Sequence, residues 1–468
     1  MSPQLREDLA ARFADLGSRP ALVEDDGDRS FADLLAEIET VRAALDAYGV
    51  RPHDVVVLAG DVSARSVAAL FALFWHRAVV VPVAVPDRQT LAAIAEVCGA
   101  GHVLTPGSRP RLEPLPAVAG DRDGRGESAG RHSATRRRLA ASGAAGLVLL
   151  SSGSTGTAKM ILHDFDALIA AKLRRRARGG TRAPAVLMVL MFDHIGGINS
   201  LLSTVLGGGR AVLPATRTPA EICRLIERHQ VRVLPTSPTF LNLMLVGGHH
   251  RRHDVSSLRM ITYGTEPMPD GLLGRVHAAF PGVRLLQTFG TSETGIATTT
   301  SAASDSTFFR FSDRDVEHRI IDGELYIRST TQFLGYLNAS DEAVTEDGWF
   351  RTGDIVEEIG DGYLRILGRA TEVINVGGEK LLPFELESIL LTSPLIEECV
   401  VYGRPNALTG QSVCVDVKPA TSMPDRIVRQ RVRAFLAERV PPYKVPAKIN
   451  VVDTVAVSER FKKVRGSR

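Results

Sequence analysis

A run of small hydroxyl and glycine residues directly follows an apolar segment about a third of the way along the chain. Residues 151–159 read Ser-Ser-Gly-Ser-Thr-Gly-Thr-Ala-Lys, and the segment before them reads Gly-Leu-Val-Leu-Leu. Glycines let backbone N–H groups point at an anion, hydroxyls add donors, and the ammonium of Lys159 meets the charge. The pattern predicts a phosphate-binding loop between a strand and a lysine. It cannot be aligned with the GxxxxGK[ST] pattern of a P-loop, and a serine-rich turn is the alternative if the loop is considered alone.

Five further polar segments follow this loop. They are TYGTEPMP (262–269), QTFGTSETG (287–295), GWFRTGD (348–354), GRATEVINVGGEKLLPFELE (368–387) and PPYKVP (441–446). Together with the loop, they make the chain resemble the adenylate-forming superfamily, which contains acyl- and aryl-CoA ligases, the adenylation domains of peptide synthetases, and luciferases. The resemblance covers essentially the whole chain. It implies an α/β fold with a large N-terminal domain of packed, parallel-rich sheets and helices, and a small, mobile α+β C-terminal domain.

The resemblance also implies a reaction. Such enzymes join a carboxylate to the α-phosphate of ATP, release pyrophosphate, and pass the acyl group to a nucleophile. ATP, Mg²⁺ and coenzyme A are therefore expected, with a carrier-protein thiol in trans or an amine as the alternative acceptor. An alternative of another class is a degenerate nucleotide-binding protein, because Ala158, Met160, Thr371 and Phe461 depart from the family pattern. Since two anions must meet, positive charge and oriented dipoles should dominate the site.

Most of the motif residues are assigned by the resemblance to the nucleotide. The residues expected to bind ATP are Ser151, Ser152, Gly153, Ser154, Thr155, Gly156, Lys159, Gly264, Thr265, Glu266, Pro267, Phe289, Gly290, Ser292, Asp354 and Arg369. Phe289 would stack on the adenine, and Ser292 would contact the α-phosphate. Glu293 would help to hold Mg²⁺. Asp354 would accept both ribose hydroxyls, although an isolated Asp in a TGD turn is more often an Asx-turn, and Arg369 would reach the same sugar or the phosphates.

The segment MFDHIGGI (191–198) resembles the part of the family that borders the acid substrate. His194 would border the carboxylate and act as a gate, with Ile195, Gly196 and Gly264 lining the pocket; a satisfied core histidine is the alternative. Amino-acid-activating relatives carry an Asp one place after the His position. Without a gap that place holds Ile195, whereas a second alignment places Asp193 there. The first alignment is favoured and predicts a small aryl or acyl acid without an α-amino group.

The C-terminal segment should carry a catalytic lysine. Counting the family's usual spacing from Pro446 leads to Lys462, with Arg465 three residues further on. Its ammonium would bridge the substrate carboxylate and the α-phosphate. Lys463 is the rival, and a solvated basic C-terminus is the alternative to both.

In the family the small domain rotates between the two half-reactions. The usual hinge position corresponds to Thr371. Gly377, Gly378 and Lys380 would form the loop beside the incoming thiol, with glycine permitting close backbone approach; a plain turn is the alternative. Domain alternation of this kind can limit turnover.

Repeated β–α patterns must position these motifs. The expected strands are 54–60, 78–83, 146–151, 185–190, 231–235 and 258–264, and the expected helices include 31–48, 66–75, 90–98, 219–229 and 269–280. Such repeats imply largely parallel sheets covered by helices, with ligands beyond the carboxyl ends of the strands. Residues 119–145 are polar, Gly- and Arg-rich and aperiodic, and are interpreted as a mobile loop. The expected domains are 1–369, which binds ATP and the acid, and 370–468, the mobile domain.

Composition excludes several classes of protein. The chain has 468 residues, 44% hydrophobic and 23% charged, which argues against collagen, coiled coil and wholesale disorder. Its 56 basic side chains nearly balance 53 acidic ones, so no global field favours nucleic acid or an acidic membrane. Only eight of the 56 are lysines, so each lysine is informative, because an ammonium and a guanidinium are not interchangeable.

The cysteines and the apolar segments bear on the compartment. Cys98, Cys223, Cys399 and Cys414 are widely spaced, which favours buried free thiols over disulfides or a zinc site. The N-terminus has no apolar segment typical of a signal peptide. The apolar stretch 67–85 is interrupted by His76 and Arg77, which favours a buried helix and strand over a membrane span. We expect a cytoplasmic monomer or homodimer.

Overall fold

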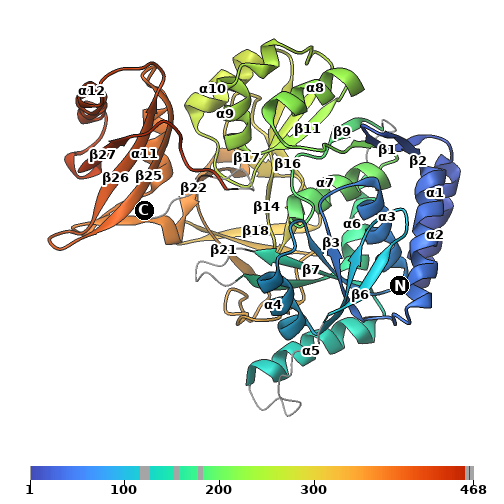
Figure 1. The fold of residues 1–468 in the computed structure, drawn as a ribbon. Coiled ribbons are helices and arrows are strands. Elements are labelled where there is room, and N and C mark those ends of the chain that lie inside the picture. Colours follow the sequence, from blue (N-terminus) through green and yellow to red (C-terminus); the bar gives the residue numbers. More distant parts are fainter. Residues whose placement is uncertain (1, 116–126, 152–157, 178–182, 459–462, 464–468) are drawn as a thin grey trace.

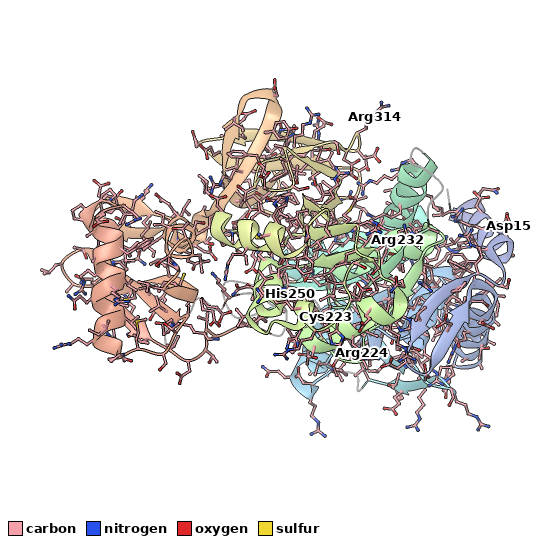
Figure 2. The ribbon with its side chains drawn as sticks, turned by 90° about the horizontal axis from the view of Figure 1, so that it is seen from above. Asp15, Cys223, Arg224, Arg232, His250 and Arg314 are labelled. Carbon is pink, nitrogen blue, oxygen red and sulfur yellow. The ribbon has the colours of Figure 1, made fainter. Side chains whose placement is uncertain are left out.

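The computed structural model describes residues 2–115, 127–151, 158–177, 183–458 and 463 of the chain. These residues form a large lobe and a small lobe. The small lobe follows β22 (Tyr363–Arg369) and stands to one side of the large lobe in two perpendicular views (Figure 1 and Figure 2). The large lobe consists of parallel-rich sheets with helices, and the small lobe is an α+β unit. The expected α/β fold class is therefore confirmed.

Seven strands form the first sheet of the large lobe. In spatial order they are β13 (Arg284–Gln287), β12 (Met260–Tyr263), β11 (Val233–Thr236), β9 (Ala185–Leu187), β10 (Arg210–Val212), β1 (Pro20–Glu24) and β2 (Gly27–Ser30). All neighbours are parallel except β2, which forms a hairpin with β1. Three helices, α8 (Pro219–His229), α9 (Pro238–Val246) and α10 (Asp270–Ala279), contribute Ile226 and Phe240 among others to the core on this sheet.

The second sheet also has seven strands. In spatial order they are β20 (Gly335–Tyr336), β8 (Lys159–Asp164), β7 (Gly146–Ser151), β4 (Val79–Val83), β3 (Val55–Ala59), β5 (Ala100–Thr105) and β6 (Arg111–Pro114). The four central strands β7, β4, β3 and β5 are parallel, and the outer ones pair antiparallel. The central strands are rich in valine and leucine because both of their faces are covered.

A shared apolar core joins the two sheets through four helices. These are α2 (Phe31–Ala47), α3 (Ala64–Trp75), α6 (Phe165–Ala177) and α7 (Ile195–Leu206), and α1 (Ser2–Leu16) adds Phe13 to the same core. Residues 66–74 of α3 are all buried, as expected of a helix that is apolar on every side. This explains why the sequence of α3 looked like part of a membrane span. Within the described part of the chain, no helix has the length and apolarity needed to cross a membrane.

A third, antiparallel sheet completes the large lobe. Its strands in order are β16 (Thr299–Ser301), β17 (Phe309–Phe311), β22, β21 (Phe350–Ile359), β19 (Glu324–Ser329) and β18 (Val316–Ile321), and the hairpin of β14 (Phe289–Thr291) and β15 (Gly295–Ala297) lies before it in the chain. Within this sheet β18 pairs antiparallel with β19, and β21 pairs antiparallel with β22.

The small lobe is one sheet with two helices. Its strands are β24 (Glu379–Leu381), β23 (Ile374–Val376), β26 (Gly410–Pro419) and β25 (Ile396–Asn406), with β27 (Lys448–Val451) also pairing with β26. Helices α11 (Pro383–Leu390) and α12 (Asp425–Ala437) supply Leu386, Leu390 and Val432 to a separate apolar core. A core of its own is what allows a unit of this size to move as one body.

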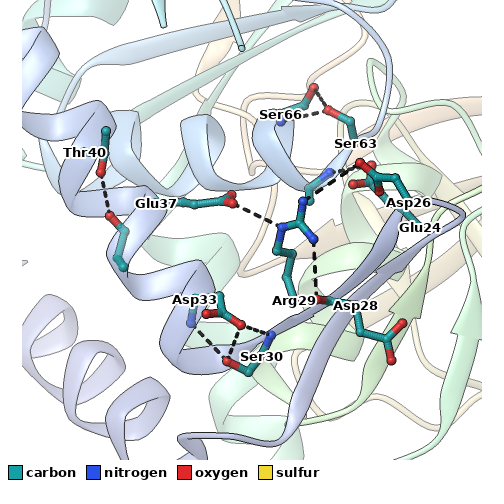
Figure 3. A network of polar contacts seen from close by, with 12 residues as sticks. Glu24, Asp26, Asp28, Arg29, Ser30, Asp33, Glu37, Thr40, Ser63 and Ser66 are labelled. Atoms are coloured by element: carbon teal, nitrogen blue, oxygen red, sulfur yellow. Dashed lines mark hydrogen bonds and ion pairs between the residues drawn. The ribbon is translucent and has the colours of Figure 1, made fainter. Parts of the chain in front are cut away.

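Local sequence signals account for the ends of several elements. Ser30 caps α2: its Oγ accepts from the Asp33 N–H, and the Asp33 carboxylate accepts from the Ser30 N–H (Figure 3). In the same network Arg29 donates to Glu37 of α2 (Figure 3). The four cysteines are buried and free, as expected, and Cys223 lies within the large lobe (Figure 2).

The prediction of a loop over residues 119–145 is wrong for its second half. Helix α5 spans Glu127–Ser142, α4 (Arg88–Cys98) precedes it, and residues 116–126 lie outside the described part. Thr135 and Leu139, one helical turn apart, are both buried, and Leu139 packs with Val79 of the second sheet. Alanine, arginine and leucine are strong helix formers. Two buried contacts are too few to produce an apolar periodicity in the sequence.

A buried ion pair ties three helices of the large lobe together. Arg6 of α1 donates through Nη1 and Nη2 to Asp166 of α6 at 2.8 and 2.9 Å, and through Nε to the Phe74 carbonyl of α3. The Ala145 N–H also donates to Asp166. We expect Asp166→Ala to lower the free energy of unfolding by about 3–5 kcal/mol, because it leaves a buried guanidinium without its carboxylate.

Chemical denaturation measures this change. The exposed Arg42–Glu39 pair provides the control, since Glu39→Ala should cost less than about 1 kcal/mol. Equal effects of the two substitutions would contradict the role assigned to the buried pair.

Candidate active site

A cleft of about 810 Å³ gathers most of the residues singled out from the sequence. Its lining includes Ser151, Lys159, His194, Ile195, Gly196, Gly264, Thr265, Glu266, Pro267, Phe289, Gly290, Ser292, Glu293, Asp354, Arg369 and Thr371. The carboxyl ends of β7, β11, β12 and β13 border the cleft, as expected for an α/β fold. Ser152, Gly153, Ser154, Thr155, Gly156 and Lys462 lie outside the described residues.

Lys159 is the first residue of β8 and is held by the chain around residue 336. Its Nζ lies 4.8 Å from the ring centroid of Tyr336 on β20. The side chain of Asn338 donates to the Ala158 carbonyl at 2.7 Å and accepts from the Met160 N–H at 2.8 Å. Asn338 therefore fixes the backbone on both sides of Lys159.

Sequence reasoning missed Tyr336 and Asn338. The segment Gly-Tyr-Leu-Asn at 335–338 lies between two of the motifs and carries no charge or metal-ligand pattern. The only available signal was an aromatic residue and an amide close to a glycine. Their role follows from the pairing of β20 with β8, which sequence spacing does not reveal.

Tyr336 also connects Lys159 with Glu293. The Tyr336 hydroxyl donates to Glu293 Oε1 at 2.9 Å. Burial and the neighbouring Glu293 carboxylate raise the pKa of the Tyr336 phenol above its usual range, so the phenol remains a hydrogen-bond donor at neutral pH. No group of three or more His, Cys, Asp or Glu side chains suited to a metal ion occurs among the described residues. A cation held by Glu293 would therefore need further oxygen ligands from a bound ligand or from water.

The hairpin of β14 and β15 carries Phe289, Gly290, Ser292 and Glu293. The Thr291 hydroxyl accepts from the N–H groups of Glu293 and Thr294, which closes the turn. A Cβ on Gly290 would lie 2.3 Å from the Gly295 carbonyl oxygen, so the close approach of the two strands requires glycine.

The ring of Phe289 is nearly buried. It stacks on Phe309 with ring centroids 6.0 Å apart and meets Phe311 edge-on at 5.7 Å. Part of Phe289 lines the cleft. One aromatic face is thus already occupied by the core of the third sheet, which fixes the orientation of the ring towards any planar ligand.

Residues 264–267 also line the cleft, and Thr265 among them has a strained backbone conformation. Thr265 has φ of 73°, in the left-handed region that non-glycine residues avoid at a cost of about 1–3 kcal/mol. The Glu266 carboxylate accepts from the Thr239 N–H in the first turn of α9 at 2.7 Å. A Cβ on Gly264 would lie 2.7 Å from the Thr288 hydroxyl, so glycine lets the two segments approach.

Asp354 and Arg369 face each other across β21 and β22. They are register partners, and Arg369 Nε lies 2.8 Å from Asp354 Oδ1. Asp354 is buried, whereas about half of the Arg369 side chain is exposed. The Thr352 hydroxyl accepts from the Asp354 N–H and donates to the Leu325 carbonyl, which holds the carboxylate in place.

His194 caps the N-terminus of α7 at the other end of the cleft. Its Nδ1 accepts from the Gly196 N–H at 3.1 Å, so the proton of the neutral ring is on Nε2. A Cβ on Gly197 would lie 2.0 Å from the Met191 carbonyl oxygen, so this turn requires glycine. Ile195 lines the cleft, while Asp193 is buried and is not part of the lining. This arrangement supports the alignment that places Ile195 in the pocket.

The small lobe contributes Lys463 to the cleft. Lys463 Nζ lies 3.1 Å from Glu387 Oε2, and the buried Glu387 carboxylate also accepts from the Val401 N–H. Lys463, the alternative to Lys462, is placed by the structure, whereas Lys462 lies outside the described residues. The assignment of the catalytic lysine remains a prediction. Gly377, Gly378 and Lys380 lie in or beside the exposed turn between β23 and β24, away from the cleft lining, and their assignment remains a prediction.

His163 of β8 contacts the turn between β14 and β15. Its Nε2 donates to the Ser292 carbonyl at 2.7 Å, and burial lowers its pKa to about 4. The His163 side chain therefore binds a proton near pH 6.5 in the unfolded chain, but only near pH 4 in the folded chain. We expect the free energy of unfolding to decrease as the pH falls from 6.5 to 4, by up to about 1.4 kcal/mol per pH unit from this group.

Denaturation curves at several pH values measure that dependence. The neutral variant His163→Gln should have a smaller pH slope than wild type between pH 6.5 and 4, and identical slopes would contradict the expectation.

Comparison with known proteins is consistent with this geometry. The chain is 29% identical to an indoleacetate–CoA ligase of Aromatoleum aromaticum over 91% of this chain and 90% of that protein. Among solved structures, an amide bond synthetase from Marinactinospora thermotolerans has a TM-score of 0.77 at 21% identity, covering 97% of both chains. The o-succinylbenzoate CoA synthetase of Bacillus subtilis has a TM-score of 0.76 at 24% identity, covering 97% of this chain and 96% of that one.

Two family models match the chain directly. The model described as AMP-binding enzyme matches residues 9–337, and the model described as AMP-binding enzyme C-terminal domain matches residues 385–462. The first match alone covers more than half of the chain. The protein therefore belongs to the AMP-binding enzyme family, the adenylate-forming superfamily that its motifs resemble.

Proposed function

We propose that this protein is a carboxylic-acid ligase that uses ATP and Mg²⁺ to form an acyl-adenylate, releases pyrophosphate, and transfers the acyl group to coenzyme A. The observation that carries the proposal is the convergence of Lys159, Glu293 and the Asp354–Arg369 pair on one cleft. Its volume of about 810 Å³ is in the usual range for small-ligand sites.

The nucleoside would bind between the hairpin and the strained segment. Phe289 and residues 264–267 all line the cleft and would enclose the adenine. The Asp354 carboxylate would accept hydrogen bonds from the two ribose hydroxyls, since a carboxylate has two acceptor oxygens. Arg369 is already paired with this carboxylate and would hold it in position.

The phosphates would lie between Lys159 and Glu293. The ammonium of Lys159, supported by the Tyr336 ring, would bind the β- and γ-phosphates. Glu293 would hold Mg²⁺ together with phosphate oxygens, which fits a site with one carboxylate. When bound, Mg²⁺ neutralises phosphate charge and acts as a Lewis acid.

The acid would enter from the His194 side. A carboxylate oxygen attacks the α-phosphorus, the new O–P bond forms, and the bond to the departing pyrophosphate breaks. Because Nδ1 of His194 accepts from the Gly196 N–H of α7, the Nε2–H is the donor that would bind the carboxylate. In the second half-reaction the thiolate of coenzyme A attacks the acyl carbon, and AMP leaves. Leu190, Ile195 and Ile296 give the pocket apolar walls that suit an aryl or acyl chain.

The acceptor is the least constrained part of the proposal. The relatives named above include CoA ligases and an amide bond synthetase, so a thiol and an amine both occur as acceptors within the fold. Coenzyme A is favoured because the exposed Lys380, beside the glycine turn 377–378, offers a cation to a phosphorylated thiol. A carrier-protein thiol would need the same turn.

Pyrophosphate release tests the proposal. The assay contains ATP, Mg²⁺ and a panel of aryl, short-acyl, long-acyl and amino acids, with and without coenzyme A. We expect release with aryl or acyl acids, little release with amino acids, and an acyl-CoA product when the thiol is present. An adenylate that is never transferred to coenzyme A would point to a carrier protein or an amine. Unimpaired ATP binding without release for any acid would favour the degenerate binder.

The two C-terminal lysines can be separated by matched variants. We expect Lys462→Ala to lower the rate of adenylate formation by about 10²–10³, the usual effect of removing one group that stabilises transition-state charge. Lys463→Ala should lower the rate less than tenfold, because the ammonium of Lys463 is already paired with the Glu387 carboxylate. Single-turnover adenylation measures both, and the reverse order would assign the catalytic role to Lys463.

A further inference from the structure

A lysine lies behind the acid pocket without a carboxylate partner. Lys172 of α6 donates from Nζ to the side-chain Oδ1 of Asn199 on α7. No Asp or Glu oxygen lies within ion-pair distance of Nζ among the described residues. An ammonium removed from water is costly unless an anion accompanies it. The position of Lys172 is therefore unexplained by the fold alone.

The lysine faces the end of the cleft. A small cavity, with room for about one water molecule, is lined by Lys172 together with Ile195, Asn199 and Ile296. The last three also line the main cleft, so the cavity lies next to the cleft, behind these side chains of α7 and β15. A ligand group that reaches Asn199 is thus one hydrogen bond away from an ammonium with two further N–H donors.

The surrounding charges do not neutralise Lys172. Arg175, one turn along α6, pairs with Asp313 and donates to the Ile296 carbonyl at 3.1 Å. Asp313 also accepts from the backbone N–H of Thr298, so its carboxylate is already engaged. The guanidinium of Arg175 adds positive charge beside the ammonium. Burial, and then Arg175, lower the pKa of Lys172 to about 7.

We propose that Lys172 is the distal end of the acid-binding pocket, and that the acid substrate carries a second anionic oxygen group, such as a carboxylate. The inference rests on the proposed function, in which His194 borders the carboxylate that is activated. Asn199 lies five positions after His194, the N-cap of α7, which corresponds to a rise of about 7.5 Å along the helix. The two acidic groups of the substrate are expected to lie about that far apart.

Matched pairs of acids test this inference. The first pair is 4-methylbenzoic acid and benzene-1,4-dicarboxylic acid, and the second is heptanoic acid and heptanedioic acid. In each pair only the second acid carries the distal carboxylate. We expect wild-type kcat/KM for pyrophosphate release at pH 6.5 to favour the diacid at least tenfold in one pair. Lys172→Met keeps the length of the side chain and should reduce that preference to about one or reverse it.

The pH dependence separates binding of an anion from a structural role. A bound carboxylate favours protonated Lys172, so the diacid preference should shrink as pH rises from 6.5 to 8.5, above the pKa of about 7. Arg175 and Asp313 are the charged side chains beside Lys172. His194 at the start of α7 and the buried His163 of β8 act on both acids equally, so the monoacid corrects for them. This measurement needs only wild-type protein and stands if the variant fails to fold.

The outcomes distinguish this inference from the proposed function. Acid binding is also followed without catalysis, by the shift in melting temperature that each acid causes with ATP and Mg²⁺ present. Preference for the monoacid in both pairs, or a Lys172→Met variant that slows both acids equally, would overturn the role of Lys172 while leaving adenylation intact. Stronger binding of a diacid without pyrophosphate release would support Lys172 and count against the proposed activity.

Discussion

The pairing of the two-residue strand β20 with β8 is the contact on which the rest of the site depends. It places Tyr336 opposite Ile161 and brings Asn338 against the backbone at Ala158 and Met160. The same segment reaches the hairpin, because the Phe333 N–H donates to the Glu293 carbonyl at 2.7 Å. One short ladder therefore sets the distance between a lysine and a carboxylate that face the same ligand.

The carboxylates of the cleft are held by donors before any ligand arrives. Glu293 accepts from Tyr336, Glu266 accepts from a backbone N–H, and Asp354 is paired with Arg369. Such preorganised groups need little rearrangement when charge develops in a transition state. This arrangement includes backbone strain at Thr265 and close backbone contacts that require glycine, such as those at Gly290 and Gly197.

The acid pocket combines apolar walls with a buried cation. Burying an ammonium among Ile195, Ile198 and Leu168 is unfavourable in the absence of an anion. In the role proposed for Lys172, an anionic group of the substrate would offset this cost. Because the pKa of Lys172 is about 7, the charge of this pocket would respond to pH and to the ligand in the physiological range.

The sequence by itself determined the local parts of this protein. The alternation of strands and helices, the capping box at Ser30, the strand before the 151–159 loop and the order of the motifs follow from periodicity, capping chemistry and turn residues. These signals lie within a few residues of one another. They were sufficient to predict the α/β fold class, whereas the residues of the cleft that were named from the sequence came from the resemblance of the motifs to the family.

Only the tertiary structure decided which distant residues complete the site. Asn338 and Ala158 are 180 positions apart, and Lys172 and Asn199 come from two helices whose packing no local pattern encodes. Helix α5 was missed because two buried side chains, Thr135 and Leu139, leave no apolar stripe in a polar segment. Contacts of this kind depend on the order of strands in the sheets and on helix packing, which are set by burial of the whole core rather than by any one stretch of sequence.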